Sequence, residues 1–161
     1  MTFSRPNPKK LKITGISEFF ADMLRALPEC GENLCPDAEA RIFQLPTTDP
    51  ALEELACDWR VHVHEGLHEG FLAARDAVRS DLRAMVAGDG GEATLAIPPA
   101  HAEAWVNATT QARLALASAH GFTDEELSRP METPVSTPRG MIRLQMDFYA
   151  AIQEWLLEAL D

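Results

Sequence analysis

The sequence is poor in positive charge, in cysteine and in long apolar runs. Its 161 residues include 25 aspartates and glutamates but only 14 lysines and arginines, so the formal net charge is −11. Nucleic-acid binding depends on neutralising phosphates with basic residues, and anionic membrane surfaces attract basic segments. The charge balance therefore argues against a nucleic-acid partner and against a membrane partner.

No apolar stretch approaches the roughly 20 residues of a membrane span. The first twelve residues contain basic side chains but no apolar run after them, so no signal peptide is expected. The three cysteines, Cys30, Cys35 and Cys57, are an odd number, and reduced thiols are the simplest expectation for them. These absences predict a cytoplasmic protein.

Four segments of the chain have helical spacing of apolar residues and predict a bundle of about four helices. They cover residues 16–27, 51–86, 98–120 and 138–160 of one domain that spans 1–161. Pro28 is expected to stop the first helix. The second helix would be about 50 Å long at roughly 1.5 Å per residue. A break near Gly66 or Gly70 is the alternative.

The remaining segments are short or irregular. Residues 11–14 and 94–97 are typical of short strands, which could pair as a ribbon. Residues 1–10 are polar and contain two prolines, so we expect a loose terminus. Residues 128–138 are rich in proline and predict a connecting loop. The predicted fold class is mainly all-α, with or without a small two-stranded N-terminal ribbon.

Small residues recur every four positions in the apolar stripe of the long helix, at Gly66, Gly70 and Ala74. They would let a neighbouring helix approach closely, and the alanine row that follows Trp105 and includes Ala112 is the natural mate. A kink at the glycines is the alternative. A homodimer seam is another use of the same face.

Charged residues occupy the other faces of the long helix, with an acidic strip beside a basic one. The basic flank consists of Arg60, Arg75, Arg79 and Arg83. A solvated face is the ordinary interpretation. In a protein this acidic, a strip of arginines would also steer an acidic peptide to the helix. The leading prediction is therefore a non-enzymatic interaction protein that needs no cofactor and contacts a protein partner through this flank.

The residues from His64 to His68 spell H-E-G-L-H and match the zinc-peptidase signature H-E-x-x-H. Histidines four residues apart share a helix face, and the glutamate between them would activate a metal-bound water. No third ligand follows at a recognisable spacing, and Phe71 stands where the metzincin extension has glycine. We therefore expect no metal here. The alternative is a zinc-dependent hydrolase with His64 and His68 as ligands and Glu65 as base.

Arg113 lies among Leu114, Ala115 and Leu116, which is an unusual setting for an arginine if it is buried. One hypothesis is a helical bundle that binds a small molecule or an anion, with Arg113 entering a pocket between helices. The other is an arginine at the edge of the core, with only its aliphatic stem packed down.

Several blocks of the chain, in order, resemble an uncharacterised bacterial family of short helical proteins, whose actinobacterial members are often encoded beside the adaptor of the Clp protease. The blocks are Ala40–Phe43 with Leu45-Pro46, Asp49-Pro50, Trp59-Arg60, Ala104–Val106, Arg113–Ala117, and Phe148-Tyr149 with Gln153–Leu156. The motif residues among them are Arg41, Trp105, Arg113 and Tyr149. The chain departs from the family pattern at Thr110, Gln111 and Ala117. The resemblance implies a mostly helical cytoplasmic protein without assigned catalytic residues, and it suggests a role in regulated proteolysis.

Overall fold

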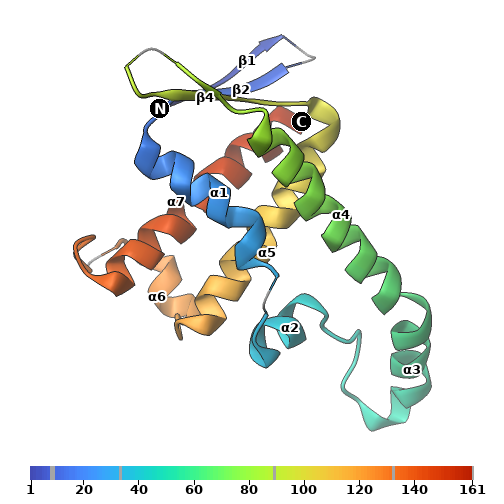
Figure 1. Cartoon of the computed structure of the whole chain (residues 1–161). Coiled ribbons are helices and arrows are strands. Elements are labelled where there is room, and N and C mark those ends of the chain that lie inside the picture. The colour runs from blue at the N-terminus through green and yellow to red at the C-terminus, as the bar shows by residue number, and fades with distance from the viewer. Residues whose placement is uncertain (8–9, 33, 89, 132, 161) are drawn as a thin grey trace.

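A computed structural model describes residues 1–7, 10–32, 34–88, 90–131 and 133–160, which form seven α-helices and one four-stranded antiparallel sheet (Figure 1). The helices are α1 (Glu18–Cys30), α2 (Pro36–Ile42), α3 (Glu53–His62), α4 (His64–Arg83), α5 (Ala102–Ala119), α6 (Asp124–Ser128) and α7 (Pro138–Leu160). The strands are β1 (Thr2–Asn7), β2 (Lys10–Ile16), β3 (Val86–Ala87) and β4 (Ala93–Ile97). Two 3-10 turns, η1 (Pro50–Leu52) and η2 (Pro99–His101), precede α3 and α5. The fold is mainly helical, as predicted, but it is not an all-α bundle.

The sheet has the order β1-β2-β4-β3 and lies across one end of the helices (Figure 1). The predicted ribbon forms its centre, where Leu11 faces Ile97 and Ile13 faces Leu95 across the β2–β4 ladder. All four of these side chains are buried. Because alternate residues of a strand point to the same face, they cover the helices with one apolar face of the sheet.

The N-terminal segment is a strand, so the prediction of a loose terminus over residues 1–10 is wrong. Thr2 pairs with Thr14 and Ser4 with Lys12, which places β1 at the edge of the sheet. Tertiary contacts hold it there, since the Phe3 and Trp155 rings lie 5.1 Å apart and Arg5 donates to the Ala159 carbonyl at 2.7 Å. Residues 8 and 9 lie outside the described part of the chain.

The main core lies between the sheet and helices α1, α5 and α7, and α4 adds Val78 to it. Helix α5 packs on α7, α4, α1 and α2, so it is the central element. Trp105 of α5 and Tyr149 of α7 are the largest fully buried side chains of the core. In the described part of the chain, no helix is both long and apolar enough to cross a membrane.

Helix α1 continues through Pro28 to Cys30, so the expected stop at Pro28 is wrong. A proline removes the one hydrogen bond that its own nitrogen would donate and crowds the preceding turn. Here only two residues follow Pro28, and its ring is buried. The last turn therefore persists despite the missing bond.

The predicted long helix of residues 51–86 is two helices, α3 and α4, that meet at Val63 and end at Arg83. The alternative of a break near Gly66 or Gly70 is closer to the structure than a continuous helix, since the break lies at Val63, three residues before Gly66. Val63 has φ −115° and ψ −40°, well away from helical φ near −63°. The bend lets the His64 ring pack against both Phe43 and Trp59, with centroids 4.8 and 5.8 Å apart. The Asp49 side chain accepts from the Ala51 nitrogen and caps the turn η1, which precedes α3.

Candidate functional site

The predicted basic flank does not form a free strip of arginines. Arg75 is 7% exposed, and its guanidinium donates to the Gly31 carbonyl. Burial lowers the pKa of Arg75, and neighbouring Asp76 partly opposes that shift. The segment after α1 covers this side of α4, which a helical wheel cannot show. The interpretation of Arg75 as a surface contact is therefore wrong.

The other arginines of that flank are separated or already paired. Arg79 pairs with Asp76 at 2.8 Å and also with Glu32. Arg60 is exposed on α3 and pairs with Glu53 at 3.2 Å. Arg83 is exposed near the end of α4. An acidic peptide would find no continuous basic surface along these four residues.

The H-E-G-L-H stretch forms the first turns of α4. His64 is half-buried, and its ring packs on Phe43 and Trp59, whereas His68 and Glu65 are exposed. The His68 ring lies 6.0 Å from that of Phe43. Among the described residues, no three His, Cys, Asp or Glu side chains come together in a way that could hold a metal ion. The contacts of His64 instead support the bend between α3 and α4.

No neighbouring helix crosses α4 at Gly66 or Gly70. Gly66 and Gly70 are exposed, and a Cβ at either would have no atom within 4 Å outside its own helix backbone. Ala74, Trp105 and Ala112 lie in the buried interior. Helix α4 does pack on α5, but only the half of α4 that begins near Ala74 contributes buried side chains. The predicted close approach at Gly66 and Gly70 is therefore wrong.

Asp81 is a buried carboxylate that the sequence patterns did not predict. It accepts a hydrogen bond from Trp105 Nε1 at 2.9 Å, and each of its oxygens lies 3.0 Å from His101 Nδ1. Asp81 follows Val78 by three residues and therefore lies on the face that α4 buries. This spacing was the feature of the sequence that could have predicted its burial. The His101 side chain is partly covered by this contact. The network orients Trp105 in the core and ties η2 to α4.

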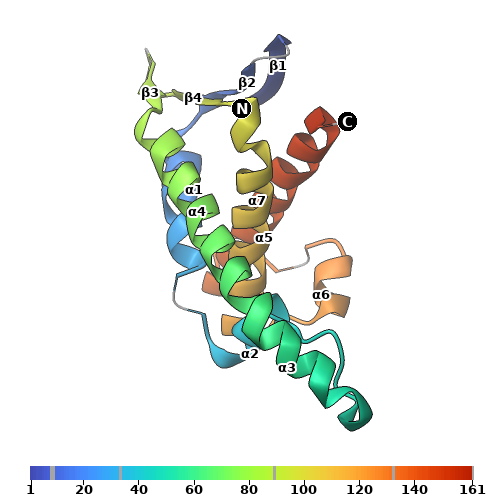
Figure 2. The ribbon, with the colours of Figure 1, turned by 90° about the vertical axis from the view of Figure 1, so that its right-hand side faces the viewer.

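Several exposed apolar side chains lie on an arm, defined here as residues 50–70: η1, α3 and the first two turns of α4. It extends away from the sheet and the bundle (Figure 2). Ala56 is the one residue of α3 that is buried, and α3 packs mainly on α4 and η1. The exposed apolar side chains are Leu52 (48%), Leu55 (50%), Val61 (62%) and Val63 (40%). Exposed apolar side chains gathered on one projecting element are typical of protein–protein contact sites.

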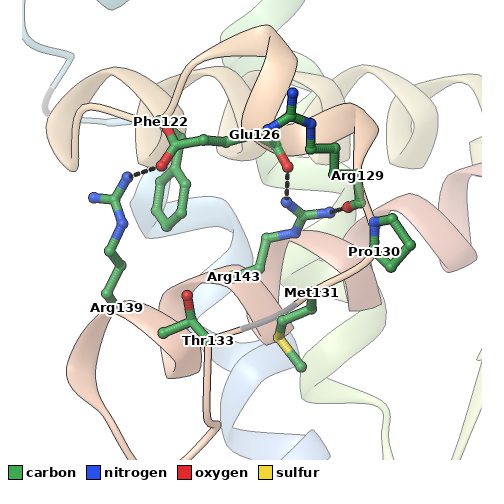
Figure 3. Close-up of a pocket in the computed structure, with 8 residues that line it drawn as sticks. All are labelled: Phe122, Glu126, Arg129, Pro130, Met131, Thr133, Arg139 and Arg143. Atoms are coloured by element: carbon green, nitrogen blue, oxygen red, sulfur yellow. Dashed lines mark hydrogen bonds and ion pairs between the residues drawn. The ribbon is translucent and has the colours of Figure 1, made fainter.

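A second feature is a small arginine-lined cavity of about 150 Å³ beside α6 (Figure 3). Arg143 donates from Nη1 to the Glu126 carbonyl and from Nη2 to the carbonyls of Leu127 and Arg129, at 2.7 to 3.1 Å. Its Nε donates to Asp147 at 2.9 Å. Arginine thus satisfies the carbonyls at the end of α6, as basic side chains often do at helix C-termini.

The neighbouring Arg139 is engaged in the same way. It donates to the His120 carbonyl and to the Glu126 carboxylate, each at 2.8 Å, and its Cζ lies 4.0 Å above the Phe122 ring (Figure 3). A hydrogen bond from the Thr123 backbone nitrogen and the one from Arg139 to the Glu126 carboxylate lower the pKa of Glu126. Because both arginines serve α6 and its connections, an anion entering this cavity would have to displace internal partners.

The four motif residues have two different settings. Trp105 and Tyr149 are buried, and both use their polar atoms inside the protein: Trp105 on Asp81, and Tyr149 on the Met23 carbonyl at 2.6 Å. Arg41 is exposed and Arg113 is half-buried, and both line one cavity between α2, α5, α6 and α7. Two of these residues therefore build the core, and two face a space large enough for a ligand.

Comparison with known proteins places the chain in a family without assigning it an activity. Neither the curated proteins nor the solved structures contain a match to this chain. One family model matches residues 17–160, which includes every helix and leaves both β1 and β2 outside the match. The chain belongs to that family, described as a domain of unknown function, DUF2017.

Proposed function

We propose that this protein is a non-enzymatic interaction domain that uses its arm, residues 50–70, to contact a partner protein. The observation that carries the proposal is the exposure of Leu52, Leu55, Val61 and Val63 on an element that extends beyond the bundle (Figure 1). Full burial of an exposed leucine or valine contributes about 1.5–3 kcal/mol, and because these side chains are already about half covered, each contributes about half of that against a partner. The arm can therefore supply a substantial part of the free energy of association.

The charge of the arm indicates the chemistry of its partner. Residues 50–70 contain five acidic side chains, all exposed, and one arginine, which Glu53 already pairs. A segment with basic side chains beside apolar ones would match both properties, because opposite charges steer encounter and apolar contacts hold the complex. This assignment replaces the acidic peptide expected from the sequence, since Arg75 and Arg79 are occupied internally.

Two other occupants fit the arm less well. A second copy of the chain fits poorly because each copy has a net charge of −11 and an acidic arm, so the two copies would repel each other. A metal-dependent hydrolase built on His64, Glu65 and His68 would have to use a histidine that already packs against Phe43 and Trp59. A link to regulated proteolysis stays a prediction, because it depends on the resemblance alone.

A peptide titration followed by NMR tests the arm. The probe is a synthetic amphipathic helix of leucine and lysine, compared with the same helix of leucine and glutamate. We expect the lysine peptide to shift amide signals of residues 50–70 and the glutamate peptide to leave them unchanged. The double variant Leu52→Ser with Leu55→Ser should weaken binding about tenfold, which corresponds to roughly 1.4 kcal/mol.

The matched control is Leu157→Ser with Leu160→Ser. These leucines are 47% exposed and also three residues apart, near the end of α7. Equal weakening by the two double variants would mean that the peptide binds the acidic surface without a site, and the proposal would be wrong. A concentration-dependent dimer that the arm variant abolishes would instead assign the arm to a second copy of the chain.

A further inference from the structure

A cavity of about 340 Å³ is lined by residues of α2, α5, α6 and α7. Helices α2 and α6 lie at the end of the bundle away from the sheet (Figure 1). The volume of the cavity falls at the small end of the range typical of small-molecule sites. Apolar side chains from three helices line it: Leu114 and Ala117 of α5, Leu127 of α6 and Met146 of α7. Charged side chains from α2, α5, α6 and α7 line the same space. The cavity therefore offers both an apolar wall and charged groups to an occupant.

Three of the four charged side chains in the cavity are paired within the protein. Arg41 pairs with Asp124 at 3.1 Å, and both side chains are substantially exposed, so this pair lies on the solvent side. Asp147 accepts from Arg143 Nε at 2.9 Å. These two carboxylates and Arg41 therefore have counter-ions within hydrogen-bonding distance.

Arg113 is different. Its Nη1 donates to Gln153 Oε1 at 2.8 Å, which is a neutral partner, and its buried Nε has no hydrogen-bond partner in the described chain. Among the described residues, no carboxylate oxygen lies within 4.0 Å of its guanidinium, whereas nine arginine–carboxylate pairs occur elsewhere in this acidic protein. A half-buried guanidinium with five N–H donors and one internal acceptor retains most of its binding capacity.

We propose that this cavity binds a small carboxylate with an apolar body, and that Arg113 is the cation that recognises it. Arginine matches a carboxylate with two parallel hydrogen bonds, which a planar guanidinium is shaped to form. The apolar body would lie against Leu114, Ala117 and Met146. A phosphate dianion fits less well, because Asp124 and Asp147 line the same cavity and would repel a second negative charge. This site is on a different part of the molecule from the arm and does not depend on its function.

The same chemistry could come from a free carboxylic acid or from the C-terminus of a peptide. The experiment compares four probes by NMR, following the Met146 methyl and the Leu114 methyls: hexanoate, hexanamide, a short peptide that ends in a free leucine carboxylate, and the same peptide amidated. We expect saturable shifts with hexanoate or with the free-acid peptide, and at least about tenfold weaker binding of the matching amide, as for loss of a charge-assisted hydrogen bond. The tighter of the two acids identifies the source.

The variant Arg113→Met keeps most of the aliphatic stem and removes the charge, and we expect it to weaken carboxylate binding at least about tenfold. The control Arg129→Met removes the same charge from a nearby exposed side chain outside this cavity and should leave binding unchanged. Equal binding of acid and amide to the unmodified protein would overturn the proposal, as would the absence of saturable shifts at Met146 and Leu114. The acid–amide comparison needs no variant, so it decides the question even if Arg113→Met does not fold.

Discussion

Removing one buried hydroxyl, in Tyr149→Phe, tests how α7 is held against α1. The hydroxyl of Tyr149 donates to the Met23 carbonyl at 2.6 Å and accepts from Gln145 Nε2 at 2.8 Å. Tyr149 is fully buried, and Met23 is 7% exposed, so water has little access to replace the hydroxyl. Desolvation also raises the pKa of Tyr149, which keeps the hydroxyl protonated and able to donate.

The expected cost follows from these two hydrogen bonds. The Met23 carbonyl keeps its bond within α1, and the half-buried Gln145 can turn toward other partners, so neither group is left wholly unsatisfied. At about 0.5–1.5 kcal/mol for each lost bond, we expect the free energy of unfolding to fall by about 2 kcal/mol. For a chain of this length, that change lowers Tm by roughly 4–8 °C.

Urea unfolding followed by circular dichroism measures this change, with an unchanged m-value showing that the variant still unfolds in one step. The variant Ser80→Ala, which removes an exposed hydroxyl from α4, is the control and should stay within about 0.5 kcal/mol of the parent. A loss below about 0.5 kcal/mol in Tyr149→Phe would refute the reasoning, because two buried bonds cannot disappear at so small a cost.

Four further predictions concern two glycines, cysteine labelling and pH. Gly70→Ala should raise the free energy of unfolding by about 0.5–1 kcal/mol, because Gly70 is exposed within α4 and a Cβ there meets nothing within 4 Å. Gly140→Ala should lower it by about 3 kcal/mol, because its Cβ would lie 2.0 Å from the Pro134 carbonyl oxygen; the same unfolding assay measures both. Iodoacetamide should label the exposed Cys57 before Cys30, whose thiol has a raised pKa because it is buried, and peptide mass spectrometry gives the order. Labelling of Cys30 first in the folded protein would contradict the packing of α1 on α7. The lowered folded-state pKa of Glu126 contributes stability above the unfolded value of 4.5, and that contribution disappears as pH falls through the folded pKa. Stability curves of Glu126→Gln and the parent should therefore differ at pH 7 and converge on acidification, and a constant difference would count against the Arg139 and Thr123 hydrogen bonds.

Local sequence patterns predicted the local elements well. Asp49 caps the turn before α3, Pro138 begins α7, and the segments 11–14 and 94–97 are strands that pair with each other. Each of these features depends on side chains within a few residues, such as a capping carboxylate, a fixed proline φ or apolar alternation. The β1 strand has no such signal, because its polar sequence becomes a strand only when β2 is present to accept its hydrogen bonds.

The candidate sites depended on tertiary structure much more than the helices did. Periodicity and composition give the positions of most helices, the apolar side of each, and an acidity that disfavours phosphate-rich partners. Which arginines are available depends instead on how elements distant in the sequence pack together. Periodicity gives the angle of a side chain around its own helix but not what covers that side. Arg75 donates to the Gly31 carbonyl and Arg79 pairs with Glu32, so both arginines already have partners inside the protein. Arg113 lines a cavity between four helices, and its hydrogen-bond partner, Gln153, is neutral.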